Sequence, residues 1–142
     1  MLRFDLTTKA YAPLMAALHA VSFETAWSEE SFRTFLDLPT TVGFINEAGF
    51  ILCTVVADEA EILTLCVHPD CRRQGIATAL LQKMEAYLKE RHVSRFFLDV
   101  RASNLPAIGL YTRNGFTQMN RRVAYYETEN GREDALVLKK EL

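Results

Sequence analysis

Apolar and polar positions along the chain recur with two periods, and these periods divide it into strands and helices. Strands are predicted at residues 2–6, 41–46, 50–57, 60–67, 96–100, 116–126 and 135–142. Helices are predicted at about residues 7–22, 28–38, 75–91 and 105–114. The order β-α-α-β-β-β-α-β-α-β-β predicts an α/β (α+β) fold, in which a single mixed, mostly antiparallel sheet is flanked by helices on both faces.

Local signals set the ends of these elements. Thr7 or Thr8 can cap the first helix, and Ser28 begins S-E-E-S-F, which is typical of a capping box. Gly49 lies in a hairpin turn where a positive φ is expected, and Gly115 is expected to cap the end of the last helix. The nearly continuous apolar run at 60–67 predicts a central strand covered on both faces. The apolar face of the first helix is predicted to comprise Ala10, Leu14, Ala17, Leu18 and Val21.

Composition narrows the classes of protein that this chain can be. Its 142 residues, 49% hydrophobic and 24% charged, fit a single domain over residues 1–142. A net charge of −2 gives no basis for binding nucleic acid or an anionic membrane. No signal-peptide pattern is present, and no apolar run approaches the roughly 18 residues of a membrane helix. We therefore expect a cytoplasmic protein with no nucleic-acid or membrane partner; the oligomeric state is left open.

The cysteines and histidines form no recognisable metal site, and no metal is expected. Cys53, Cys66 and Cys71 include no C-x-x-C pair, and their odd number argues against a disulfide framework. Cys71 falls in a loop and is the thiol most exposed to reaction, whereas the other two fall in predicted strands. The histidines are scattered, as is typical of structural or solvent-facing residues: His19, His68 and His92.

The junction between the apolar strand and the long helix, V-H-P-D-C-R-R-Q-G-I-A-T, has the features of a phosphate site. A helix N-terminus has about four unpaired N–H groups and a partial positive charge, which together attract an anion. Gly75 and Ala77 are small enough for a phosphate to approach the backbone, and Arg72 and Arg73 add positive charge. The spacing matches neither a Walker loop nor a Rossmann fingerprint. A solvated, arginine-rich turn without a ligand is the alternative.

The spacing R-x-x-G-x-A at this junction resembles the acetyl-CoA loop of the GNAT superfamily of N-acetyltransferases. A later segment of the chain resembles the second half of the GNAT core and reads F-L-D-V-R-A-S-N-L-P-A-I-G-L-Y-T-R-N-G-F. The matching residues are Asn104, Ala107, Leu110, Tyr111, Gly115 and Phe116. Three segments are similar to the RimI type, the bacterial ribosomal-protein-alanine N-acetyltransferases. They are V-R-A-S-N followed by A-I-x-L-Y, the upstream W-S-E-E-S-F, and the tail R-R-x-x-Y-Y. The resemblance spans essentially the whole chain.

This resemblance implies the GNAT fold and transfer of an acetyl group from acetyl-CoA to a protein N-terminal α-amine. For the RimI type, the acceptor is the N-terminal alanine of a small-subunit ribosomal protein, a basic partner, and the amine attacks the thioester directly. The residues implied to bind the co-substrate are Leu65, Cys66, Val67, Arg72, Arg73, Gln74, Gly75, Ile76, Ala77, Thr78 and Asn104. A covalent acetyl-Cys66 intermediate and an Asn104 that only caps its helix remain as alternatives.

Asp99 and Tyr111 are the candidate catalytic residues. Tyr111 follows Asn104 by two helical turns, so one helix face can present both side chains to the co-substrate. In the RimI type this tyrosine resembles the general acid that protonates the CoA thiolate; a core aromatic is the alternative. The RimI pattern L-E-V-R-A-S-N has a glutamate as general base, where this chain has the shorter Asp99. We expect Asp99 to act through a water or with a weakened role, unless it only pairs with Arg101 or a backbone group.

The residues implied to flank the acceptor slot are Trp27, Phe32, Tyr125 and Tyr126. Adjacent strand residues face opposite ways, so at most one of the two tyrosines is expected to line the slot. Glu24, Glu29 and Glu30 could attract a basic peptide, or only complement a helix start. An α-amine of pKa roughly 7.7–8 is about one quarter neutral near pH 7.4, whereas a lysine is only ~0.1% neutral. An N-terminal acceptor is compatible with a short carboxylate as base.

Two other functions stay open at this stage. A GNAT enzyme could act on a small-molecule amine, such as an amino acid, polyamine or aminoglycoside. A catalytically weak CoA-binding module is the second alternative; Tyr111 argues against it, and the aspartate at position 99 keeps it open.

Overall fold

The computed structural model describes residues 2–23 and 26–142, and the strands of these residues form a seven-stranded sheet. The strands are β1 (Asp5–Leu6), β2 (Thr41–Ile45), β3 (Gly49–Val56), β4 (Glu59–Val67), β5 (Arg95–Arg101), β6 (Thr117–Thr128) and β7 (Gly131–Glu141). The helices are α1 (Ala12–Ser22), α2 (Glu29–Leu36), α3 (Ile76–Glu90) and α4 (Leu105–Arg113), with 3-10 turns at Lys9–Tyr11 and Pro69–Cys71. The predicted succession of strands and helices is confirmed.

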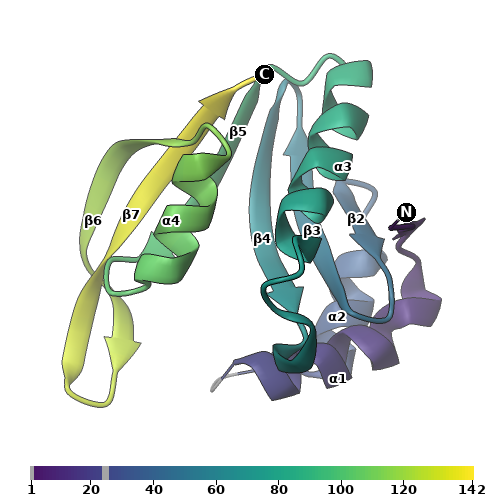
Figure 1. The fold of residues 1–142 in the computed structure, drawn as a ribbon, viewed down its shortest axis with the longest axis horizontal. Helices are drawn as coiled ribbons and strands as arrows, with labels where there is room; N and C mark the ends of the chain where they lie inside the picture. The colour runs from purple at the N-terminus through teal and green to yellow at the C-terminus, as the bar shows by residue number, and fades with distance from the viewer. Residues whose placement is uncertain (1, 24–25) are drawn as a thin grey trace.

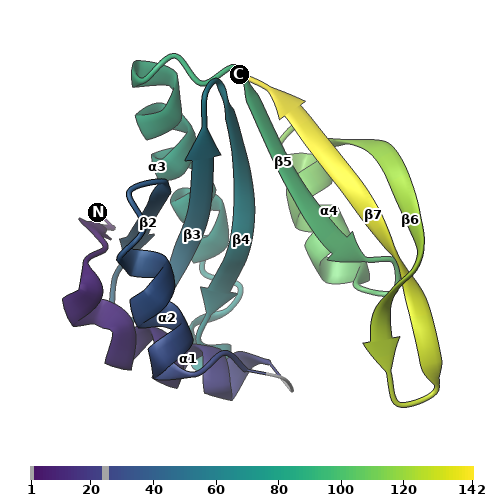
Figure 2. The ribbon, with the colours of Figure 1, turned by 180° about the vertical axis from the view of Figure 1, so that it is seen from behind.

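The sheet has the order β1-β2-β3-β4-β5-β7-β6. β4 and β5 run parallel, because α3 carries the chain across the sheet between them, and the other neighbouring pairs of described strands are antiparallel. Figures 1 and 2 show α3 and α4 on one face and α1 and α2 on the other. The mixed, mostly antiparallel sheet with helices on both faces is therefore as predicted.

Each face of the sheet has its own apolar cluster. The larger cluster lies under α3 and α4. The apolar residues that recur at helical spacing in α3 are Ile76, Ala77, Leu80, Leu81, Met84 and Leu88, and all of these except Ala77 are buried in this cluster. The smaller cluster lies under α1 and α2 and includes the fully buried Phe32, Phe50 and Met15. Full burial of an apolar side chain of this size contributes roughly 1.5–3 kcal/mol, so both faces hold their helices firmly.

The first helix begins later, and buries a different face, than predicted. α1 starts at Ala12, and Pro13 occupies its first turn, where a proline needs no N–H partner. Its buried residues are Ala12, Met15, Leu18 and His19. Of the predicted face only Leu18 is buried, and Val21 is 54% exposed. The predicted face was wrong and did not include His19, which was expected to be structural or solvent-facing; partners for both ring nitrogens allow this histidine to be buried.

The predicted helix ends are present with small shifts. Thr8 precedes a 3-10 turn and makes no side-chain cap hydrogen bond. Ser28 caps α2, and its Oγ accepts a hydrogen bond from Ser31 N–H at 3.1 Å. Gly115 was expected to cap α4, but the C-cap residue is Asn114. Gly115 is the next residue, and its φ of 93° is the left-handed conformation that commonly ends a helix at this position.

Gly49 does not adopt the positive φ expected for it. A left-handed residue occurs instead at the other end of β3, where Ala57, with φ 55°, lies in the turn to β4. Gly49 is needed for a different reason, the close approach of β4. A Cβ at this position would overlap the Cys66 carbonyl oxygen and lie 3.1 Å from Val67 Cα.

The strand β4 is central, as predicted, but is covered on both faces over only part of its length. Glu61 is exposed, and burial alternates along the strand. The register between β3 and β4 shifts by one residue in the middle of the two strands. Leu52 pairs with Thr64, but the next residue of β3, Cys53, pairs with Ile62. Leu63 is the extra residue of this irregularity, which has the form of a bulge.

The parallel ladder between β4 and β5 ends at the same place. It runs from the Glu59–Arg95 pair to the Ile62–Leu98 pair. Beyond Ile62 the two strands separate, as Figure 1 shows. A bulge bends its strand away from its neighbour, so the irregularity at Leu63 accounts for the opening between β4 and β5.

Replacing Gly49 with alanine should lower the free energy of unfolding by about 2 kcal/mol, because the added methyl group must displace the β4 backbone. Gly109→Ala in α4 is the matched control: its Cβ would meet only the flexible end of Arg113, at 3.1 Å. Alanine favours a helix interior by roughly 0.5–1 kcal/mol over glycine, so this variant should be equally or more stable. Urea denaturation measures both, and equal losses in the two variants would contradict the explanation.

Candidate active site

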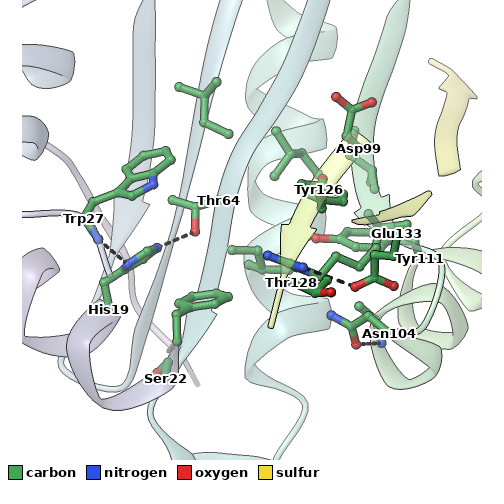
Figure 3. A pocket seen from close by; sticks show the side chains of 18 of the residues that line it. His19, Ser22, Trp27, Thr64, Asp99, Asn104, Tyr111, Tyr126, Thr128 and Glu133 are labelled. Carbon is green, nitrogen blue, oxygen red and sulfur yellow. Dashed lines mark hydrogen bonds and ion pairs between the residues drawn. The ribbon is translucent and has the colours of Figure 1, made fainter. Parts of the chain in front are cut away.

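A groove of about 1090 Å³ opens where β4 and β5 separate. The separated strands form its floor. α1 and the segment around Trp27 form one wall, and α4 and the β6–β7 hairpin form the other. Figure 3 shows His19, Trp27 and Thr64 on one side of the groove and Asp99, Tyr111 and Asn104 on the other. Six of the predicted site residues line it: Trp27, Leu65, Asp99, Asn104, Tyr111 and Tyr126.

Asp99 projects from β5 into the groove, and its side chain is 17% exposed. Its Oδ1 lies 3.7 Å from Nε of Arg122 on β6. Arg101, considered above as its partner, instead pairs with Glu133, at 3.2 Å. The long contact with Arg122 leaves the carboxylate able to take part in proton transfer.

Glu61 is a second carboxylate beside Asp99, which sequence reasoning missed. The parallel register pairs Glu61 with Phe97, and Asp99 lies two residues further along the same face of β5. Burial and the negative charge of Asp99 raise the pKa of Glu61, and the positive charge of Arg122 opposes them. The proximity follows from strand pairing, which no local motif indicates.

Tyr111 lines the groove from α4 and is 7% exposed. Its ring packs edge-on against Phe116, with 5.5 Å between centroids. Burial is the main cause that raises the pKa of this phenol well above its ordinary value, so Tyr111 stays protonated at neutral pH. The residue is part of the core and at the same time lines the groove.

Asn104 both caps α4 and lines the groove. Its Oδ1 accepts a hydrogen bond from Ala107 N–H at 3.2 Å, which is the capping role considered above. Because its oxygen makes this bond, its amide nitrogen is the group available to a ligand in the groove.

The loop before α3 has the geometry of an anion site. Gly75 caps the helix with φ 76°, and Arg73 also has a positive φ, 64°. The hydrogen-bond ladder of the helix begins with Ala79 N–H donating to Gly75 O at 3.0 Å. The preceding N–H groups at the helix start, from Ile76 to Thr78, are therefore directed at an exposed surface, which fits a phosphate.

The predicted β4 residues differ in what they present to the groove. Leu65 lines it, but the Cys66 side chain points to α1, where Sγ lies 3.3 Å from Leu18 O and 3.2 Å from Ser22 Oγ. Burial raises the pKa of the Cys66 thiol. The carbonyl of Val67 accepts a hydrogen bond from Arg72 Nε at 3.3 Å, which joins β4 to the loop. A protonated thiol turned toward α1 is poorly placed to form an acetyl-enzyme.

On the acceptor side, Trp27 lines the groove and Phe32 does not. Phe32 is 0% exposed and packs against Trp27 and Phe50, at centroid distances of 5.4 and 5.6 Å. The prediction that Phe32 contacts the peptide is therefore corrected: it supports Trp27 from the core. Glu29 pairs with Arg33 at 2.5 Å. Glu24 lies outside the described residues.

Tyr126 lines the groove, whereas Tyr125 is 45% exposed and lies outside its lining. The pairing of β6 with β7 shifts between Arg122 and Tyr126, and Ala124 has φ 54°. This irregularity brings the two tyrosine rings edge-on to each other at 5.1 Å, rather than onto opposite faces. Burial, followed by the charge of nearby Asp99, raises the pKa of Tyr126 to about 12.

Two further groups line the groove without having been predicted. His19, buried in α1, contacts both Trp27 and Thr64. The β6–β7 hairpin adds three carboxylates: Glu127, Glu129 and Glu133. In the sequence, E-T-E-N-G-R-E looks like an ordinary polar turn, and the groove comes into view only when β6 and β7 are paired.

The sequence profile of the acetyltransferase (GNAT) family matches residues 12–116. The chain belongs to the acetyltransferase (GNAT) family. It is 39% identical over 117 residues to the ribosomal protein bS18-alanine N-acetyltransferase of Escherichia coli strain K12, a match that covers 79% of this chain and 78% of the relative. The expected RimI-type resemblance and the class of acetyl-CoA-dependent N-acetyltransferase are confirmed.

Solved GNAT structures agree with this membership. The crystal structure of the ribosomal-protein-S18-alanine N-acetyltransferase from Escherichia coli superposes with a TM-score of 0.87 and 31% identity, covering 98% of this chain and 94% of the other. Arabidopsis thaliana NAA60 in complex with acetyl-CoA shares the fold, with a TM-score of 0.86 and 21% identity, covering 99% and 98%. Within the described residues, no helix combines the length and the apolar character needed to span a membrane.

Replacing Cys66 with alanine should leave kcat of this GNAT enzyme within about threefold of wild type, since its thiol is bonded away from the groove. The variant should lose about 1 kcal/mol of stability through the small cavity. Steady-state acetylation assays and thermal unfolding measure the two effects. Loss of activity by a factor of 10³ in a folded variant would instead support a covalent acetyl-cysteine.

Proposed function

We propose that this chain transfers an acetyl group from acetyl-CoA to the N-terminal α-amine of a protein, namely the N-terminal alanine of a small-subunit ribosomal protein. We infer that it works in the cytoplasm and that residues 1–142 act as a single GNAT domain. The observation that carries the proposal is that Asp99, Tyr111 and Asn104 share one groove in a chain 39% identical to an Escherichia coli enzyme named for this acceptor.

The donor side uses the loop before α3 and the end of β4. N–H groups from about Arg73 to Thr78 hold the pyrophosphate, with side-chain charge from Arg72 and Arg73. Leu65 and the amide of Asn104 lie along the groove, where the pantetheine arm would run. Acetyl-CoA supplies the activated thioester, and a protein of the same fold was solved with acetyl-CoA.

Proton transfer is assigned to two residues in the same groove. Asp99, directly or through one water, takes the proton that the α-ammonium must lose before its nitrogen can attack. Tyr111 gives a proton to the departing thiolate, and its raised pKa keeps that proton in place until the thiolate forms. Because Arg122 approaches Asp99 only to 3.7 Å, the base is oriented without being held in a short ion pair.

The acceptor side favours a positively charged peptide. The groove is lined by four carboxylates, those of Asp99, Glu127, Glu129 and Glu133, and by one guanidinium, that of Arg101. Arg101 pairs with Glu133 at 3.2 Å and Arg132 with Glu127 at 3.0 Å, so the excess negative charge is partly balanced. Such a wall attracts an α-ammonium followed by basic residues and repels an acidic peptide. This charge distribution favours a basic peptide N-terminus, such as that of a ribosomal protein, over an acidic one.

Purified enzyme should acetylate short peptides that begin Ala-Arg with a kcat/KM at least tenfold above peptides that begin Ala-Glu, because the hairpin carboxylates attract the first and repel the second. The assay is thiol release from acetyl-CoA, with mass spectrometry to locate the acetyl group. A peptide with a blocked N-terminus and a free lysine is the control and should not react. Turnover confined to polyamines, amino acids or aminoglycosides would contradict the proposal.

Tyr111→Phe should lower kcat by about 10²–10⁴ while acetyl-CoA still binds, because the acid is lost and the ring is kept. Burial raises the pKa of Tyr111, so the wild-type rate should show no loss from this phenol between pH 8 and 10. Asp99→Asn should lower kcat by about 10², because the proton acceptor is lost, whereas Asp99→Glu should stay active. An unchanged kcat/KM in Asp99→Asn would show that another group is the base.

A further inference from the structure

His19 joins three parts of the acceptor side of the groove. It lies on α1 and is 3% exposed. Its Nδ1 accepts a hydrogen bond from the backbone N–H of Trp27 at 3.0 Å, and its Nε2 lies 3.3 Å from Thr64 Oγ1 on β4 (Figure 3). One side chain therefore connects α1, the segment before α2, and the part of β4 that has separated from β5.

These two contacts define the protonation state of the ring. A nitrogen that accepts a hydrogen bond from an N–H carries no proton, so Nδ1 is bare and Nε2–H donates to Thr64. An imidazolium has two donors and no acceptor, so it cannot keep the bond from Trp27. The contact with Trp27 therefore exists only while His19 is neutral.

The surroundings of His19 favour the neutral ring. Aromatic rings of Phe23, Trp27 and Phe32 lie at centroid distances of 4.3, 5.3 and 5.4 Å, with Phe50 of β3 behind them at 6.4 Å. Burial lowers the pKa of His19, and no carboxylate in the described part of the chain contributes to this shift.

The ionisable groups on the neighbouring elements do not compensate a charge on the ring. On β4 they are Glu59 and Glu61, which lie in the part still paired with β5, and Cys66, whose thiol pKa burial raises. On α2 they are Glu29 and Glu30, both exposed, with Glu29 paired to Arg33. A protonated His19 would therefore stand in an apolar site with no counter-charge among the described residues.

We propose that neutral His19 is a positioning residue that fixes the Trp27 wall of the acceptor groove to β4. The role in acceptor binding rests on the function proposed above. His19 contacts only the acceptor side, so its loss should weaken peptide binding and leave the acetyl-CoA loop and Tyr111 undisturbed.

The kinetic test compares three variants. His19→Phe keeps a ring of similar volume and removes both hydrogen bonds; it should raise KM for an Ala-Arg peptide by about tenfold, with kcat and KM for acetyl-CoA within about twofold. His19→Asn places an oxygen near the position of Nδ1 and should recover part of the loss. Thr64→Val removes only the second contact and should raise the peptide KM by about threefold. An unchanged peptide KM in folded His19→Phe, or an equal rise in KM for acetyl-CoA, overturns the proposal.

A titration without acceptor tests the same contact independently. Trp27 is the only tryptophan in the chain, so its emission reports on this wall alone. As pH falls, emission of the wild type should change with a midpoint below the ordinary imidazole pKa of about 6.5, and His19→Phe should lack this change. His92→Asn, at an exposed histidine, should behave as wild type. The same transition in His19→Phe, or none in the wild type above its acid unfolding, overturns the proposal.

Stability provides the second acceptor-free measurement. Folding lowers the pKa of His19, so the imidazole in the unfolded chain takes up a proton at a higher pH than the imidazole in the folded protein. The free energy of unfolding therefore decreases as the pH falls below about 6.5. His19→Phe should lose that part of the pH dependence, and an identical pH dependence in both proteins counts against the proposal. If peptides are not acetylated at all, the proposed function fails, and these titrations still decide whether His19 holds Trp27.

Discussion

The site depends on one constraint, the end of the hydrogen-bond ladder between β4 and β5. A strand in the middle of a sheet normally has both of its edges paired, because unpaired buried N–H and C=O groups are costly. β4 keeps its pairing with β3 along its length, but its pairing with β5 stops at Ile62. Past that point its other edge faces the groove, where only water or a bound ligand can complete its hydrogen bonds. The bulge at Leu63 therefore creates both the space and the need for a ligand.

The opposite end of the two strands is held closed, which fixes the angle between the two halves. Ser94 N–H donates to Asp58 O at 2.7 Å, and Leu142 N–H donates to Ser94 O at 2.8 Å. Lys140 on β7 lies 2.5 Å from Glu85 on α3 and donates to Asn114 O at 2.7 Å. A largely buried ion pair contributes little net stability compared with apolar packing, but its geometry is specific. Here it sets α3, whose first turn is the proposed phosphate site, relative to α4, which carries Tyr111.

The sequence predicts the parts of this molecule that local spacing determines. The strands and helices occur in the expected order, although α1 begins later and β1 is shorter than predicted. The loop at Gly75 and the Asn104–Tyr111 pair follow from motifs a few residues long. The parts that were missed depend on which strands pair and in what register. Glu61 becomes relevant because β4 lies parallel to β5, and the hairpin glutamates because β6 and β7 turn toward the groove.

Two errors of burial depend on contacts that are distant in the sequence. The predicted apolar face of the first helix left out His19, and Phe32 was placed at the acceptor slot because the family resemblance implies that its segment flanks the slot. In the structure both are buried, the histidine because its two nitrogens are bonded and the phenylalanine because the rings around it leave no path to the groove. Hydrogen-bond partners far along the chain decide such cases, and a helical period cannot reveal them.

The charge of the groove also bears on which amine can react. A wall of carboxylates stabilises an ammonium, so it raises the cost of removing the proton that blocks attack. For an α-amine this cost starts from a pKa of roughly 8, and for a lysine from about 10.4, a difference of about 3 kcal/mol. Asp99 shares its surroundings with Glu61, whose pKa is raised, and with Arg122, which opposes that rise, so the local charge is partly balanced at the base. Under the proposed function, the same groove would attract a basic peptide and still deprotonate its N-terminus, whereas the more basic lysine side chain would remain charged.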